Sequence, residues 1–131
     1  MTALPPEGPP QHVVRHIGIV DDDPAVRDSL HFLLDVSGYP AATFDSAKDF
    51  EARRDHAGLA GLILDHHMPL VTGLELVARL RAAGDRLPVL LITGSPTPAI
   101  AAQAAALGVA RTVEKPPTED DLLRFVASVL G

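Results

Sequence analysis

The chain has 131 residues, no cysteine and a formal net charge of −6 at pH 7. This length suits one domain that buries roughly two-thirds of its unfolded surface. Without cysteine there is no thiol nucleophile, disulfide framework or cysteine-ligated zinc site, which fits a reducing cytosol. An acidic balance with two lysines argues against direct nucleic-acid binding. Apolar runs stop far short of the roughly 20 residues that cross a bilayer, so we expect a cytoplasmic chain without a membrane segment.

Residues 1–12 differ in composition from the rest of the chain. Residues 1–11 contain four prolines, a single charge and no continuous apolar core. Such a segment is neither a signal peptide nor a helix, and we predict a disordered leader at residues 1–12. Residues 13–131 show no repeat and no internal linker, and they are predicted to form one domain.

Beyond the leader, apolar segments with strand character alternate five times with amphipathic segments. The strands are predicted at about residues 12–20, 39–44, 61–65, 87–93 and 109–114. The helices are predicted at about residues 24–38, 46–56, 73–81, 99–107 and 118–129. Pro24 is typical of a first helical turn, and Gly38 ends that helix. Two pairs resemble capping boxes at helix N-termini: Ser46 with Asp49, and Thr118 with Asp121.

This alternation predicts an α/β fold of three layers, a five-stranded parallel sheet with helices on both faces. Right-handed crossovers bring the carboxyl ends of all strands to one edge. Those ends carry Asp21, Asp65, Thr93 and Lys115. In the flavodoxin-like strand order 2-1-3-4-5, the order reverses between the first and third strands, where ligands bind. The site is therefore expected where Asp21 and Asp65 meet.

Three carboxylates would converge at this edge, those of Asp21, Asp22 and Asp65. Two carboxylates about 4 Å apart repel by about 4 kcal/mol at an effective dielectric of about 20, so the cluster predicts a bound cation. Ligation by carboxylates, waters and a phosphate is typical of Mg²⁺. The ion would orient a phosphoryl donor and share the developing charge with Lys115. Aspartate can act as the nucleophile in such a transfer.

Five short motifs at this edge occur in order along the chain. They are Val20-Asp21-Asp22-Asp23, Leu64-Asp65-His66-His67-Met68-Pro69, Gly73, Ile92-Thr93-Gly94 and Glu114-Lys115-Pro116. Each is weakly specific alone, but together they resemble the receiver domain of two-component response regulators, most of all the nitrogen-fixation type. The resemblance covers about residues 14–130.

The resemblance implies a role for each residue of the site. Asp65 would accept a phosphoryl group from a sensor histidine kinase or a phosphotransfer protein. Thr93 would donate a hydrogen bond to a phosphoryl oxygen after a small inward shift, and Lys115 would pair with the phosphoryl group. The Mg²⁺ ligands would be Asp22, Asp65, the backbone carbonyl of His67 and, largely through water, Asp21. Such a chain catalyses only its own phosphorylation and dephosphorylation, so we do not expect an enzyme.

The resemblance also implies an output. The face formed by the fourth helix, fifth strand and fifth helix would change its affinity for an output domain, for another partner or for a second copy of the chain. Transcriptional regulation is the expected context. The chain is either a stand-alone receiver or the receiver part of a longer regulator, in which an output domain would begin after Gly131.

The sequence departs from the family pattern near the site. Receivers commonly carry an aromatic residue in the fifth strand shortly before the lysine, whereas this chain has Thr112 and Val113. An imidazole at position 67, two residues beyond the acceptor, could alter the lifetime of the phosphoryl group. The missing aromatic favours an alternative, a non-phosphorylated module that binds partners constitutively.

Other interpretations explain less of the pattern. Asp21 to Asp23 could merely cap the first helix, but capping does not require three acids. A metal-dependent phosphatase would need an aspartate where His67 stands. A zinc site at His66 and His67 would need three or four ligands, and neighbours in an extended segment point in opposite directions.

Overall fold

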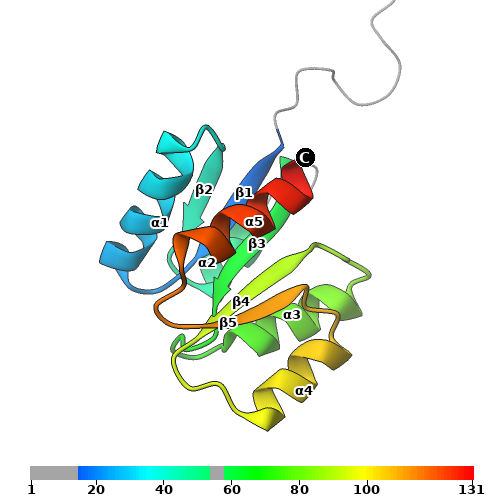
Figure 1. Cartoon of the computed structure of the whole chain (residues 1–131). Coiled ribbons are helices and arrows are strands. Elements are labelled where there is room, and N and C mark those ends of the chain that lie inside the picture. The colour runs from blue at the N-terminus through cyan, green and yellow to red at the C-terminus, as the bar shows by residue number, and fades with distance from the viewer. Residues whose placement is uncertain (1–14, 54–57) are drawn as a thin grey trace, which may run out of the picture.

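A computed structural model describes residues 15–53 and 58–131 (Figure 1). The strands are β1 (His16–Val20), β2 (Ala41–Phe44), β3 (Leu59–Asp65), β4 (Val89–Thr93) and β5 (Arg111–Glu114). The helices are α1 (Pro24–Val36), α2 (Ala47–Arg53), α3 (Gly73–Ala82), α4 (Pro98–Ala106) and α5 (Glu119–Leu130). The predicted leader and the predicted end of the second helix lie outside the described residues.

The strands form one parallel sheet in the order β2-β1-β3-β4-β5, with β3 in the middle. This order confirms the flavodoxin-like α/β fold of three layers. Two apolar cores separate the layers. One core joins the sheet to α1 and α5, and the other joins it to α2, α3 and α4. The crossovers therefore place helices on both faces and all strand carboxyl ends on one edge.

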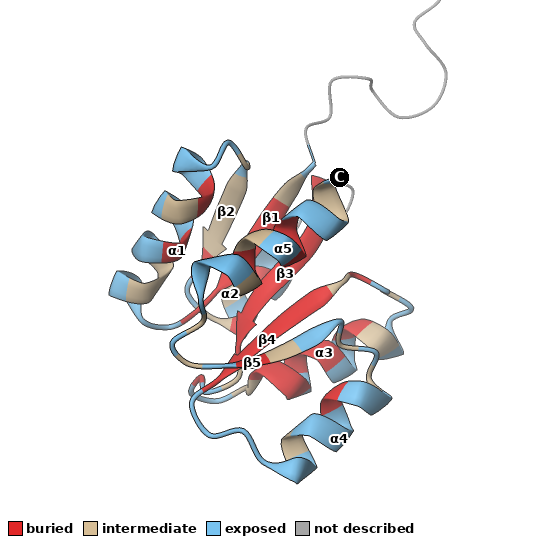
Figure 2. Ribbon diagram, in the orientation of Figure 1, coloured by how far each residue is buried: buried red, intermediate tan, exposed pale blue. Residues whose placement is uncertain are grey.

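The central strand of the sheet, β3, is buried on both faces. Every residue of β3 is buried, as Figure 2 shows by the red colour of this strand. Leu62 and Leu64 belong to the core under α2, α3 and α4, whereas Ile63 belongs to the core under α1 and α5. Burial on both faces explains why this strand reads as a continuous apolar run rather than an alternating one.

Three helices end in the same way, and this corrects the predicted strand starts. Gly38, Gly84 and Gly108 have φ of 83°, 83° and 70°, a conformation that glycine adopts without strain. The amide after each glycine then bonds back into the helix, as Tyr39 N does to the carbonyl of Leu34 at 2.8 Å. Residues 39, 85 and 109 thus complete helices, so β2 and β5 begin two residues later than predicted. β4 also begins two residues late, after a turn in which the N–H of Leu87 donates to the carboxylate of Asp85.

The two expected capping boxes are only half formed. Ser46 and Thr118 each accept a hydrogen bond from the backbone N–H three residues on. The carboxylate of Asp49 instead binds Arg53 and the N–H of Asp45, and that of Asp121 binds Arg111. A complete box is present at α3, between Thr72 and Glu75.

No helix within residues 15–53 and 58–131 is both long and apolar enough to cross a membrane.

Candidate functional site

Two neighbouring strands carry buried aspartates to the same point. In the ladder between β1 and β3, Val20 lies opposite Leu64, so the next residues, Asp21 and Asp65, emerge side by side. Their exposed fractions are 1% and 2%. Asp22 follows in the exposed turn that leads to α1. One carboxylate oxygen from each of the three lies within 4.8 Å of those of the others, which is compact enough to hold one ion.

Burial makes this cluster electrostatically unfavourable. Burial raises the pKa of the Asp21 carboxyl above its ordinary value, and the negative charge of Asp65 raises this pKa further. The hydrogen bond from the N–H of Asp23, at 2.9 Å, acts in the opposite direction and lowers it. The carboxylates therefore lack sufficient compensation from the protein alone, which is the chemistry of a divalent cation site with oxygen ligands.

Lys115 supplies one compensating charge. Its Nζ lies 2.9 Å from Oδ1 of Asp65, and its backbone N–H is held by the carbonyl of Thr93 at 2.9 Å, immediately after β5. Burial alone would lower the pKa of Lys115. The hydrogen bond to Asp65 and the charges of Asp65, Asp21 and Asp22 outweigh it, so the pKa is raised and the ammonium form is favoured.

The two oxygens of Asp65 have different surroundings. Oδ1 accepts hydrogen bonds from Lys115 Nζ and from the backbone N–H of His67 at 3.1 Å. Within the described ranges, no hydrogen bond reaches Oδ2, and none from a backbone N–H reaches the carbonyl of His67. One carboxylate oxygen and one carbonyl are thus available to a ligand at the strand end.

Thr93 lies at the end of β4, fully buried, but its hydroxyl is already engaged. Its Oγ1 lies 2.7 Å from Nε2 of His67 and accepts a hydrogen bond from the N–H of Ser95 at 3.2 Å. The structure thus brings Asp21, Asp22, Asp65 and Lys115 together as predicted, with Thr93 beside them and turned to His67. The contact between His67 and Thr93 was not predicted.

The two histidines do not form a metal site. His66 Nδ1 accepts a long hydrogen bond, 3.4 Å, from the N–H of Leu74, whereas His67 reaches Thr93. Burial lowers the pKa of His66, and the neighbouring imidazole of His67 lowers it further. In the part of the chain that the structure describes, the group of potential ligands is the three aspartates alone.

Two further residues support the site. Nη1 of Arg27 on α1 donates to the carbonyl of Asp21 at 2.7 Å and so fixes the turn that carries Asp22. Gly73 begins α3 against the acceptor, and a Cβ there would lie 2.7 Å from the carbonyl oxygen of Asp65. The sequence interpretation used Gly73 as a helix start and as one of the receiver-like motifs, but it did not predict this close approach to Asp65. It did not use Arg27, although the place of Arg27 one turn after the aspartates was a usable signal.

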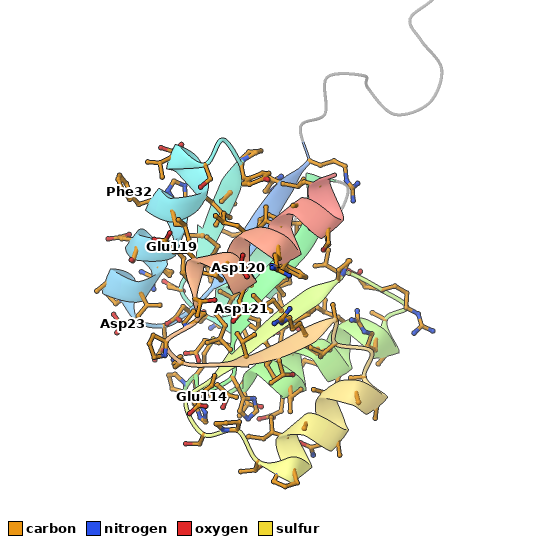
Figure 3. All side chains as sticks on the ribbon, in the orientation of Figure 1. Asp23, Phe32, Glu114, Glu119, Asp120 and Asp121 are labelled. Carbon is orange, nitrogen blue, oxygen red and sulfur yellow. The ribbon has the colours of Figure 1, made fainter. Side chains whose placement is uncertain are left out.

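A hydrophobic groove of about 930 Å³ runs from the site between α1 and α5. It begins at Asp21 and Lys115 and continues along α1 to Phe32 and Val36, whose exposed fractions are 66% and 62%. Figure 3 shows Phe32 on α1 and a group of acidic side chains, Glu119, Asp120 and Asp121, at the start of α5. Of these acids Glu119 lines the groove, whereas Asp120 pairs with Arg124 and Asp121 pairs with Arg111. A largely apolar surface therefore leads directly to the carboxylate cluster.

Asp21→Asn should stabilise the metal-free protein. The substitution removes a buried charge beside Asp65, so we expect a gain in unfolding free energy of about 1–4 kcal/mol at neutral pH. Because the folded pKa of Asp21 is raised, the wild type loses stability as pH rises through that pKa. The difference in unfolding free energy between Asp21→Asn and the wild type should therefore vanish below the ordinary carboxyl pKa of about 3.9.

Urea unfolding in EDTA across this pH range measures the effect. Asp28→Asn, on the exposed side of α1, is the matched control and should change little. Equal stability changes for the two variants at neutral pH would contradict the expectation.

The fold and the site identify the class of protein. The model of the response regulator receiver domain matches residues 17–127, and the chain belongs to that family. The transcriptional regulatory protein FixJ of Bradyrhizobium diazoefficiens is 36% identical over 115 residues, which are 88% of this chain and 56% of that protein. The C4-dicarboxylate transport transcriptional regulatory protein DctD of Pseudomonas aeruginosa is 35% identical over 112 residues, 86% of this chain and 24% of that protein.

Solved structures agree with this assignment. Response regulator StyR superposes with a TM-score of 0.82 at 32% identity over 89% of this chain and 59% of that chain. Full-length FixJ from B. japonicum superposes with a TM-score of 0.76 at 36% identity over 88% of this chain and 57% of that chain. The predicted resemblance to the nitrogen-fixation type is thus confirmed. The chain spans about half the length of FixJ.

Proposed function

We propose that this chain is a phosphorylated receiver in which Asp65 accepts a phosphoryl group from a sensor histidine kinase or a phosphotransfer protein. The observation that carries this proposal is the asymmetry of the Asp65 carboxylate. Lys115 and the His67 N–H hold Oδ1, while Oδ2 has no hydrogen-bond partner among the residues described. Oδ2 is the nucleophile. It attacks phosphorus, and the bond from phosphorus to the donor nitrogen breaks with its electron pair returning to the donor.

The remaining residues are assigned to binding and orientation. Asp22, Asp65 and the backbone carbonyl of His67 would ligate Mg²⁺ directly, and Asp21 would act largely through water. When bound, the ion neutralises charge on the transferred group. Lys115 keeps Asp65 oriented and then pairs with the phosphoryl group. The Thr93 hydroxyl donates to a phosphoryl oxygen.

A macromolecular donor suits the surroundings of the acceptor. The groove between α1 and α5 carries exposed apolar side chains up to the site, which suits contact with the surface of another protein. A small phosphate ester would not contact that apolar surface. The proposal therefore places the donor protein over α1 and the start of α5.

The output is proposed from the relatives. FixJ and DctD are named as transcriptional regulatory proteins, so the phosphorylated chain would act in transcription through an attached or separate output domain. The responding face is that of α4, β5 and α5, and a homodimer through it is part of the proposal. The acidic chain itself would not contact DNA, and its place is the cytoplasm. No activity beyond its own phosphorylation and dephosphorylation is assigned.

A second candidate is a constitutive interaction module of the same fold. Its support is β5, where Thr112 is half-buried and Val113 is buried, so that no aromatic side chain stands before Lys115. Such a module would bind its partner independently of Asp65.

Removal of the metal should prevent phosphorylation. Incubation of the wild type with a small phosphodonor and Mg²⁺ should add the mass of one phosphoryl group, because the ion relieves the repulsion among the three carboxylates. The same incubation with excess EDTA should add none. Intact-protein mass spectrometry measures both. Absence of any mass increase with Mg²⁺ would refute the proposed function.

A further inference from the structure

The hydroxyl of Thr93 and the imidazole of His67 form a contact that the proposed roles do not use. We propose that His67 is a positioning residue that holds the Thr93 hydroxyl in the unphosphorylated protein and has to release it when Asp65 carries a phosphoryl group. The inference rests on the proposed function and assigns a regulatory step to the same site. Its starting point is the distance of 2.7 Å between Nε2 and Oγ1.

Two hydrogen bonds fix the position of this hydroxyl oxygen. One comes from the N–H of Ser95 at 3.2 Å, and the other joins it to His67. Thr93 is fully buried, so bulk water does not replace either partner. A hydroxyl has one proton and two lone pairs. Whichever imidazole tautomer is present, Oγ1 has to leave His67 if Thr93 rotates to a new acceptor.

His67 is joined to both groups that change. Its backbone N–H donates to Oδ1 of Asp65 at 3.1 Å, and its side chain holds Thr93. A phosphoryl group on Asp65 would therefore alter both ends of this one residue. His67 is exposed and lies at the beginning of the segment between β3 and α3. A change in the position of its side chain would therefore change the protein surface.

This segment is suited to report such a release. Pro69 and Leu70 follow within three residues, and Leu70 is 99% exposed with a φ of 71°. A leucine with positive φ is unusual because its Cβ is crowded by the backbone. The ring of His67 also contacts that of His66, with centroids 5.1 Å apart. Release of Thr93 by His67 would thus act on a segment that is exposed at the surface.

The first test examines the unphosphorylated protein. The three-bond Hα–Hβ coupling of Thr93, measured by NMR, should show a single rotamer in the wild type. It should average over several rotamers in His67→Phe, which keeps a ring but lacks the hydrogen bond, and in His67→Ala. His67→Gln should largely restore the single rotamer. His31→Ala, at an exposed histidine on α1, is the matched control and should leave the coupling unchanged. Identical couplings in all five proteins would overturn the inference.

The second test measures the release with beryllofluoride, an analogue of the phosphoryl group, in the presence of Mg²⁺. Removing one hydrogen bond that opposes the bound state should tighten binding by about fivefold in His67→Phe. In a Thr93→Val background the same substitution should have no effect. Equal affinities of wild type and His67→Phe would overturn the inference while leaving the proposed function intact. If the wild type binds no beryllofluoride and gains no phosphoryl group, the proposed function fails, and the Thr93 coupling still decides whether His67 holds the hydroxyl.

Discussion

Asp65→Asn should take up no phosphoryl group under conditions that phosphorylate the wild type. The amide lacks the charged oxygen that attacks phosphorus, so the expected loss is complete. The fold should survive, because the Asn side chain keeps an acceptor for Lys115 and for the N–H of His67. Loss of the ion pair and relief of the repulsion with Asp21 have opposite signs, so the change in stability should be small.

Intact mass after incubation with a small phosphodonor and Mg²⁺ measures this loss, and thermal unfolding confirms that the variant is folded. Asp28→Asn, which leaves the site untouched, should be phosphorylated normally. An equal mass increase in Asp65→Asn would show that another residue is the acceptor. Affinity for an identified partner separates the two candidate functions, since a constitutive module would bind equally with Asp65 or Asn at this position.

Gly73→Ala should destabilise the protein and disturb the site. A Cβ at this position would lie 2.7 Å from the carbonyl oxygen of Asp65 and 2.9 Å from Cα of His66, and backbone atoms cannot rotate away. We expect a loss of at least about 1–3 kcal/mol, typical of overpacking, because α3 has to move off the end of β3. That movement would also displace Asp65, so phosphorylation should slow.

Urea unfolding and the rate of phosphorylation measure the two consequences. Gly94→Ala is the matched control: its Cβ would meet only Lys115, with Cδ at 3.9 Å, so it should change stability little. If Gly73→Ala and Gly94→Ala have the same unfolding free energy, the close approach of α3 to Asp65 does not explain why position 73 is a glycine.

The strand order was predictable because the chain alternates between two periodicities, and few topologies connect such segments without left-handed crossovers. The strand starts were not. Tyr39 and Val109 are apolar and read as strand residues, yet their N–H groups bond to helix carbonyls behind a glycine of positive φ. Composition reveals the glycine but not which of its neighbours completes the helix.

The site was predictable to the extent that backbone topology determines it. Asp21 and Asp65 follow strands that pair in register, so their meeting follows from the sheet alone. Side-chain contacts depend on rotamers that only the packed structure selects. The bond of His67 to Thr93 joins residues 26 positions apart, and the capture of Asp121 by Arg111 displaced an expected cap. Neither could be read from local spacing.

The central place of β3 has a consequence for how a signal can leave this molecule. Asp65 ends a strand that is flanked on both sides by two others and buried along its whole length. Such a strand belongs to the last part of a domain to undergo local unfolding. Its backbone therefore serves as a stationary support on slow time scales. Under the proposed function, a chemical change at its tip would be transmitted outward by side-chain rotation and loop rearrangement around it, while the strand itself would stay in place.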